Sequence, residues 1–192
     1  MWGRGFFWER LVKTLCLALF TGLFLAPGAN ARELEIGLWS PVWATFNDSA
    51  KTQSLTGGGI TVILSSSFGL GLDSVGANFV PTDASSDSPQ LKHTLFNFSF
   101  TMPRKEALDI TLGFGLGTVS YSCDTCSTNY ESGKSSQIFL EGRGNLWGLE
   151  WAMGLRKVSG LIKGVVLGAG NKVADKNAGF TAASFGVGVG FK

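Results

Sequence analysis

The sequence predicts an all-β protein: an antiparallel, up-and-down transmembrane β-barrel of eight strands. Three observations predict this fold. Large apolar residues alternate with small or polar ones over many short segments, which gives each segment one apolar face as a β-strand. The polar connections between the segments are alternately long and short, as in membrane barrels with long outer loops and short periplasmic turns. An export signal precedes the first segment.

Residues 1–31 have the features of a cleaved signal peptide. Three basic residues precede an apolar run over residues 14–26, which is shorter than the about 20 residues of a membrane-spanning helix. The run ends in Pro-Gly, and Ala-Asn-Ala at residues 29–31 matches the cleavage pattern. We predict cleavage after Ala31 and a single barrel domain over residues 32–192.

The charge of the predicted mature chain excludes some classes of protein. Residues 1–31 hold three of the sixteen basic and one of the fourteen acidic residues, so thirteen of each remain and the formal net charge is zero. Because the chain has no excess of positive charge to attract phosphate groups, we expect no nucleic-acid partner. No mature segment approaches about 18 consecutive apolar residues, which excludes a helical membrane protein, whereas the length accommodates eight spanning strands of about ten residues.

Alternation predicts five strands in the first part of the mature chain. In the first of them Pro41 interrupts the pattern, which predicts a bulge or the end of regular pairing. The fourth and fifth form the clearest hairpin, with phenylalanine and leucine on one face and small or polar residues on the other. The five predicted strands cover residues 33–46, 58–65, 67–80, 91–102 and 108–121.

The number of strands in the rest of the chain depends on residues 145–168. One long strand there, bent near Ser159 and Gly160, follows a strand over residues 135–143 and gives eight strands in total. Long connections then alternate with short ones, and we prefer this count. A break at Ser159 gives nine strands. The same break with one continuous strand over residues 58–73 restores eight, but it places the cysteine-containing loop on the periplasmic side.

The last twelve residues show the strictest alternation of the chain. Glycines occupy one face of this predicted strand and bulky apolar side chains the other. We assign the bulky face to lipid and the glycine face to a narrow lumen. The bulky face consists of Phe185, Val187, Val189 and Phe191.

With these features the chain resembles the small eight-stranded outer-membrane β-barrel proteins of Gram-negative bacteria. The resemblance covers residues 33–192 as a pattern and rests on the export signal, the alternating segments, the loop asymmetry and the final strand. It implies export through the inner membrane, insertion into the outer membrane as a monomer, and contact with outer-membrane lipids. The final strand resembles the signal read by the barrel-assembly machinery, although Lys192 follows the last aromatic residue, Phe191.

Four tryptophans are candidates for the aromatic girdles that such barrels carry at the two membrane–water interfaces. Indole rings favour this interface because one end is apolar and the other polar. For each of them the alternative is a place in the lumen or core. The candidates are Trp39, Trp43, Trp147 and Trp151.

Six charged residues fall on candidate inward faces and predict a network inside the barrel. The interior of an eight-stranded barrel is just wide enough for side chains to fill, so we expect ion pairs and hydrogen bonds that plug the lumen. The alternative is a narrow conduction path. The six residues are Glu35, Asp109, Glu141, Arg143, Glu150 and Arg156.

The Cys-Asp-Thr-Cys segment at residues 123–126 is the sharpest local motif. We expect a disulfide between Cys123 and Cys126, because the periplasm is oxidising. A redox pair would require a helix in a βαβ unit, and a metal site would require further ligands; the sequence around the motif provides neither. We therefore predict no metal and no cofactor.

The pattern predicts a structural or surface-interaction protein of the outer membrane and not a large-pore porin. One alternative is a soluble secreted barrel or sandwich that binds a small apolar ligand, which would turn the bulky faces inward. The second is an outer-membrane lipid-modifying enzyme. Catalysis there would require a histidine near a serine and a carboxylate, and no such pairing appears on one strand face around His93, the only histidine. We therefore predict that the protein is not an enzyme.

Overall fold

The computed structural model describes eight segments of the chain: residues 34–46, 52–64, 67–79, 90–102, 108–123, 130–147, 149–165 and 174–191. The predicted signal peptide over residues 1–31 lies outside these residues. Within the described segments, no helix has the length and apolar character needed to cross a membrane.

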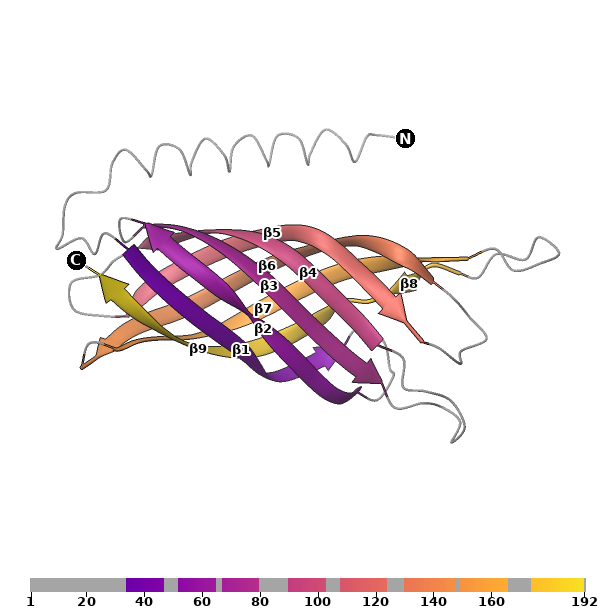
Figure 1. Ribbon diagram of the computed structural model, residues 1–192, viewed down its shortest axis with the longest axis horizontal. Helices are drawn as coiled ribbons and strands as arrows, with labels where there is room; N and C mark the ends of the chain where they lie inside the picture. The colour runs from indigo at the N-terminus through magenta and orange to yellow at the C-terminus, as the bar shows by residue number, and fades with distance from the viewer. Residues whose placement is uncertain are drawn as a thin grey trace, which may run out of the picture. The chain divides into compact units, whose positions relative to one another are not determined.

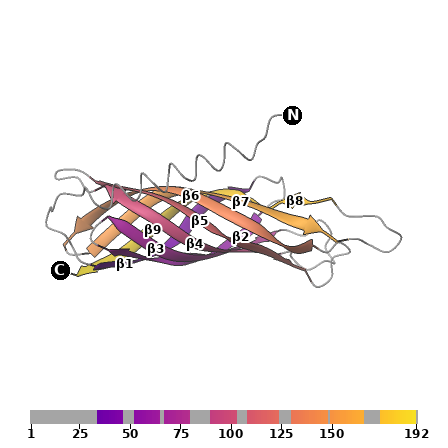
Figure 2. The same ribbon diagram turned by 90° about the horizontal axis from the view of Figure 1, so that it is seen from above.

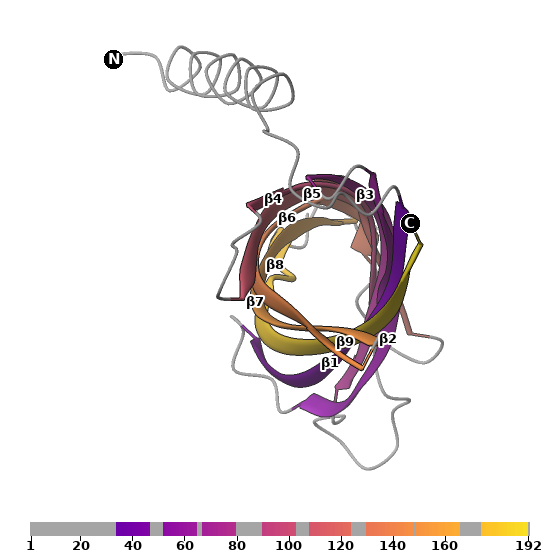
Figure 3. The same ribbon diagram turned by 90° about the vertical axis from the view of Figure 1, so that its left-hand side faces the viewer.

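The described residues form one closed antiparallel barrel (Figures 1 and 3). Consecutive strands pair from β1 to β7, and β9 closes the ring by pairing with both β7 and β1. The strands are tilted relative to the long axis of the barrel (Figure 2), as closure requires. They are β1 (Leu34–Phe46), β2 (Thr52–Leu64), β3 (Phe68–Phe79), β4 (Gln90–Met102), β5 (Asp109–Ser122), β6 (Tyr130–Leu146), β7 (Leu149–Gly164), β8 (Lys176–Asn177) and β9 (Phe180–Phe191).

The two-residue strand β8 is the beginning of the same barrel strand as β9. Val158 of β7 pairs with Phe180 of β9, and Leu161 of β7 pairs with Asn177 of β8 in the same register. Between them the Ala178 N–H donates to the Gly160 carbonyl oxygen at 2.9 Å. The barrel therefore has eight strands, which confirms the predicted fold class.

The preferred strand count is confirmed, with corrected boundaries. β7 continues through Ser159 and Gly160 without a break. β6 ends at Leu146 and β7 begins at Leu149, so the connection before β7 does not lie at residue 144; Trp147, the residue that follows β6, adopts a positive φ of 54°. β2 and β6 begin earlier than alternation predicted, because their first residues join the ladder without an apolar face. The bulge predicted at Pro41 is present as a register shift between Pro41 and Trp43.

One section of the barrel is apolar on its outside. It lies toward the end of the barrel that carries the three short connections, the first residue of β1 and the last residue of β9. All eight long strands contribute, and the four bulky residues of β9 are 42–50% exposed on this surface. We call this surface the apolar band; its residues are Leu38, Ile60, Leu64, Leu72, Phe96, Met102, Leu112, Leu116, Ile138, Leu140, Leu149, Met153, Leu155, Phe185, Val187, Val189 and Phe191.

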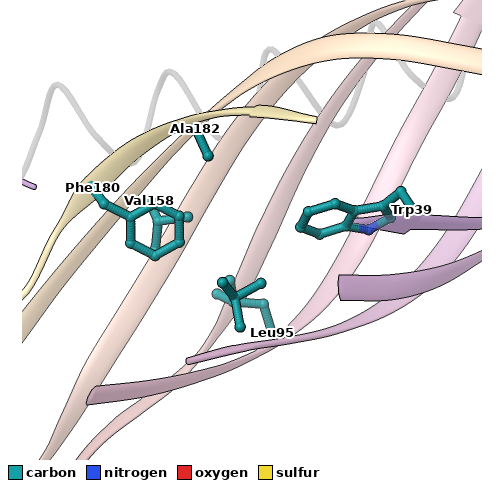
Figure 4. Close-up of a cluster of buried hydrophobic side chains, with 6 residues drawn as sticks. Trp39, Leu95, Val158, Phe180 and Ala182 are labelled. Atoms are coloured by element: carbon teal, nitrogen blue, oxygen red, sulfur yellow. The ribbon is translucent and has the colours of Figure 1, made fainter. Parts of the chain in front are cut away.

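In the section toward the longer connections the arrangement is the reverse of that in the apolar band, with apolar side chains inside and mainly polar ones outside. Its interior is apolar and includes a buried cluster around Leu95, Val158 and Phe180 (Figure 4). A second apolar cluster, which includes Val119 and Ile162, lies beyond it. The outside of this section carries Leu161, which is 50% exposed, among hydroxyl and lysine side chains; we call these hydroxyl and lysine side chains the polar collar. The collar comprises Ser40, Thr56, Ser74, Thr94, Thr118, Lys134, Ser136, Lys157, Ser159 and Thr181.

Candidate functional site

A charged network occupies the lumen inside the apolar band, and Arg156 of β7 lies at its centre. The Arg156 guanidinium forms ion pairs with Glu141 of β6 and with Asp73 of β3, the latter at 3.2 Å. Its Nε also donates to the Ser184 hydroxyl of β9 at 3.3 Å. The Arg156 side chain is 2% exposed and that of Asp73 is 0% exposed, so these charges are fully withdrawn from water. Burial on this scale is tolerated only because each charge has a partner.

A second arginine links the network to the lumen end nearer the short connections. Arg143 pairs with Glu35 of β1 and, at 3.4 Å, with Glu141, which therefore joins the two arginines. Next to it, Asn145 donates to the carboxylate of Glu150 at 2.6 Å. The pairs connect strands on different sides of the barrel, so the network bridges the lumen.

Asp73 accepts hydrogen bonds from neutral side chains as well as from Arg156. Trp39 Nε1 donates to it at 2.8 Å and Gln137 Nε2 at 2.7 Å. Gln137 Nε2 also donates to Asn97 at 3.0 Å. Ordered donors around a buried carboxylate replace the water it has lost.

Two aromatic rings flank the central guanidinium. The Arg156 Cζ atom lies 3.7 Å from the Trp39 ring centroid and 4.3 Å from that of Phe139, within the range of cation–π attraction. Phe139 faces Gly113 across the β5–β6 ladder, and a Cβ atom on Gly113 would lie closer to Phe139 Cζ than two non-bonded carbon atoms can approach, which is a steric clash. The glycine thus leaves space for the ring that packs on the arginine.

Gly113→Ala should therefore lower the free energy of unfolding by about 1–3 kcal/mol, because the added methyl group displaces Phe139 from Arg156. Urea unfolding of the barrel in detergent micelles measures the change. Gly142→Ala is the matched control, since the nearest atom to its Cβ is Leu108 Cδ1 at 3.6 Å. Equal stability of the two variants would contradict a structural role for the space at Gly113.

The structure brings together four of the six predicted lumen residues in one set of ion pairs: Glu35, Glu141, Arg143 and Arg156. Glu150 is 6% exposed nearby, and Asp109 is half-buried at the end of β5, opposite Arg143 in the ladder. The prediction did not include Asp73, Asn97 or Gln137. The signal for Asp73 was present, because it shares a strand face with Gly69 and Gly71.

The four tryptophans occupy different environments. Trp39 is 8% exposed in the lumen, which corrects its assignment to an interfacial girdle: its N–H is bound to Asp73 instead of facing the membrane surface. Trp43 and Trp147 point outward and are 59% and 96% exposed. Trp151 is half-buried, and its ring covers Gly144 on the neighbouring strand.

His93 forms a pair that the sequence did not reveal. Its Nδ1 lies 2.8 Å from the Ser135 hydroxyl, and its Nε2 lies 2.9 Å from the Ala178 carbonyl oxygen. Because a carbonyl oxygen only accepts, Nε2 carries the proton and Nδ1 accepts from Ser135. The two side chains come from β4 and β6 and meet inside the apolar-filled section, where they are 1% and 4% exposed. No strand-face pattern could reveal a contact between two strands.

The described residues contain no group of three or more metal-ligating side chains. Cys123 is disulfide-bonded. Cys126 lies outside the described residues, so the pairing of these two cysteines stays a prediction.

Comparisons with known proteins identify the fold. No protein-family model and no curated protein sequence matches the chain. Among solved structures, the crystal structure of Neisserial surface protein A superposes with a TM-score of 0.56 at 14% identity, over 85% of this chain and all of that one. The chain has the fold of the small outer-membrane β-barrels. Outer membrane protein AlkL, solved in lipid bilayers, superposes at 0.51 and 10% identity, over 88% of this chain and 94% of that one.

Proposed function

We propose that the protein is an outer-membrane β-barrel with a structural or surface-interaction role, and that it is not a large-pore porin. The observation that carries this proposal is the apolar band: large aliphatic and aromatic side chains surround one section of the barrel while charged side chains fill the interior beneath them. Removing one such side chain from water is worth about 1.5–3 kcal/mol, so a band of this size favours lipid. The proposed partners are outer-membrane lipids and, during insertion, the barrel-assembly machinery; the proposed mature form is a monomer.

The filled lumen supports the exclusion of a large pore. Beside Glu35, Arg143 and Glu150 the described side chains leave a cavity of about 10 Å³, which is room for about one water molecule. The apolar clusters occupy the other section of the lumen. We therefore expect no porin-like conductance from the reconstituted chain.

The two alternative functions have less support. A soluble barrel with an apolar ligand requires the bulky side chains inside, whereas those of the apolar band face outward. A lipid-modifying enzyme requires catalytic groups that lipid can reach. His93 and Ser135 are enclosed in the lumen, and a backbone carbonyl occupies the place of a triad carboxylate.

Fractionation of a Gram-negative host that expresses the full chain tests the proposed function. The mature chain should be recovered with the outer membrane, and an unheated sample should migrate differently from a boiled one on a gel, because the closed barrel resists unfolding by detergent. In planar bilayers the purified protein should show no porin-sized conductance steps. Recovery in the soluble periplasm would contradict the membrane assignment, and large conductance steps would contradict the exclusion of a porin.

A further inference from the structure

We propose that Lys134, Ser136, Lys157 and Ser159 form a binding site for the phosphate groups of anionic membrane lipids, in the leaflet on the side of the long connections. The inference rests on the proposed function, since it requires the apolar band to lie in a bilayer.

The four side chains form one outward patch on β6 and β7, and all four are exposed. Ser136 and Ser159 face each other across the ladder. Lys134 lies two residues from Ser136 in the direction of the long connections, and Lys157 lies two residues from Ser159 in the direction of the band. Alternate residues of a strand are about 7 Å apart, and directly opposite residues about 5 Å. One lysine therefore lies on each side of the pair of serine hydroxyl groups. The lysine side chains are long and flexible enough to bring their ammonium groups toward these hydroxyl groups.

The patch lies at the edge of the apolar band that is nearer the long connections. Lys157 is opposite Ile138, which is 62% exposed, and follows Leu155, which is 59% exposed. Trp43 marks the same level, because Ala183 of β9 pairs with Leu155 on one side and with Trp43 on the other. Lipid chains that cover Leu155 and Ile138 would therefore bring their headgroups to the lysines, whose apolar stems extend along the surface.

The charge of the patch is not neutralised within the part of the chain that the structure describes. Lys134 and Lys157 form no ion pair with the described acidic residues. Lys92 on β4 adds a further outward positive charge, whereas Glu131 lies opposite Lys163, farther from the band. Lysine ammonium and serine hydroxyl groups are hydrogen-bond donors to phosphate oxygens, and basic side chains attract anionic headgroups.

Lipid retention by the folded mature chain tests this site. The protein is inserted into phosphatidylcholine vesicles that contain a minor fraction of phosphatidic acid, extracted in mild detergent, and its bound lipids are counted by native mass spectrometry. The wild type should retain phosphatidic acid above its proportion in the vesicles. Lys157→Gln should reduce this preference about fivefold, and Lys134→Gln similarly. Lys163→Gln is the matched control, since it removes the same charge from the same face of β7. Lys163 lies opposite Glu131 and six residues farther from the apolar band than Lys157, so its loss should leave the preference unchanged.

Two further conditions define the bound group. High salt should weaken the preference because the lysines are solvent-exposed. At equal ionic strength, inorganic phosphate should displace no more lipid than chloride does, because the apolar band holds the acyl chains beside the patch; greater displacement by phosphate would overturn the assignment to a lipid. Insertion with retention in the bulk proportion, or equal loss in the Lys157 and Lys163 variants, would overturn the site and leave the proposed function standing. A wild type that fails to insert would overturn both.

Discussion

Replacing Arg156 with Met should lower the free energy of unfolding by about 3–5 kcal/mol. The variant leaves Asp73 and Glu141 buried without the guanidinium, and removal of one member of a buried ion pair costs this much because the remaining charge is uncompensated. It also removes the cation between the rings of Trp39 and Phe139. Urea titration in detergent micelles, followed by tryptophan fluorescence and by gel mobility of unheated samples, measures the loss.

Arg143→Met is the matched control for this prediction. Arg143 also pairs with two carboxylates, but its side chain is 9% exposed and that of its partner Glu35 is 14% exposed, so water can solvate the remaining charges. Its loss should therefore cost less. Neutralising Glu141 as Gln in the Arg156→Met background should recover part of the stability. A larger loss for Arg143→Met than for Arg156→Met would contradict the central position of Arg156.

The two faces of the apolar-band section could be predicted from the sequence because they depend only on whether a residue occupies an odd or an even position of its strand. The strand count could be predicted because long and short connections alternate. Val187 and its bulky neighbours on β9 occupy one face, with glycine on the other, whichever strand lies beside them. The ion pairs could not be predicted in this way. Asp73 and Arg156 are 83 residues apart and come from strands that are not adjacent in the barrel. Only closure of the barrel, with its particular register, brings them together.

At Trp39, the position in the strand alternation and the chemistry of the side chain predict different environments. Its indole favoured an interfacial position, yet it alternates with Glu35 and Gly37 on the inward face of β1. Register prevails, because turning one side chain outward would move every neighbour on the strand to the opposite face. A buried carboxylate, Asp73, then satisfies the indole N–H inside the lumen.

The sequence shows where the interior of the barrel changes from charged to apolar. At that point along a strand, the apolar residues move from the outward-facing positions to the inward-facing ones. On β4 the apolar residues at positions 91 and 95 face inward, whereas those from Phe96 onward face outward. On β7 the outward residues end at Leu155 and the inward ones begin at Val158. The same change occurs between Leu116 and Val119 on β5. The sequence-based prediction assigned one apolar face to the whole length of each strand and therefore missed this change. The change marks the edge of the apolar band.

Leu112→Arg should destabilise the barrel in lipid vesicles by about 2–4 kcal/mol. Leu112 is 49% exposed within the apolar band on β5, and an arginine on the lipid-facing surface near the bilayer midplane costs this much because its charge leaves water. Val187→Arg, at a similarly exposed position on β9, should behave alike. The free energy of folding into phosphatidylcholine vesicles, from urea titration with gel mobility as the readout, provides the measurement.

Thr118→Arg separates the effect of lipid from a general effect of arginine on a strand. Thr118 lies on the same strand and the same outward face as Leu112, six residues farther toward the long connections and within the polar collar. If the apolar band is the lipid-facing surface, as proposed, the collar lies at or beyond the membrane surface, and this substitution should cost about 0–1 kcal/mol. Similar costs for Leu112→Arg and Thr118→Arg would contradict the proposed edge of the membrane. A large cost for Leu112→Arg alone would locate that edge between Leu116 and Thr118, where the apolar residues change face.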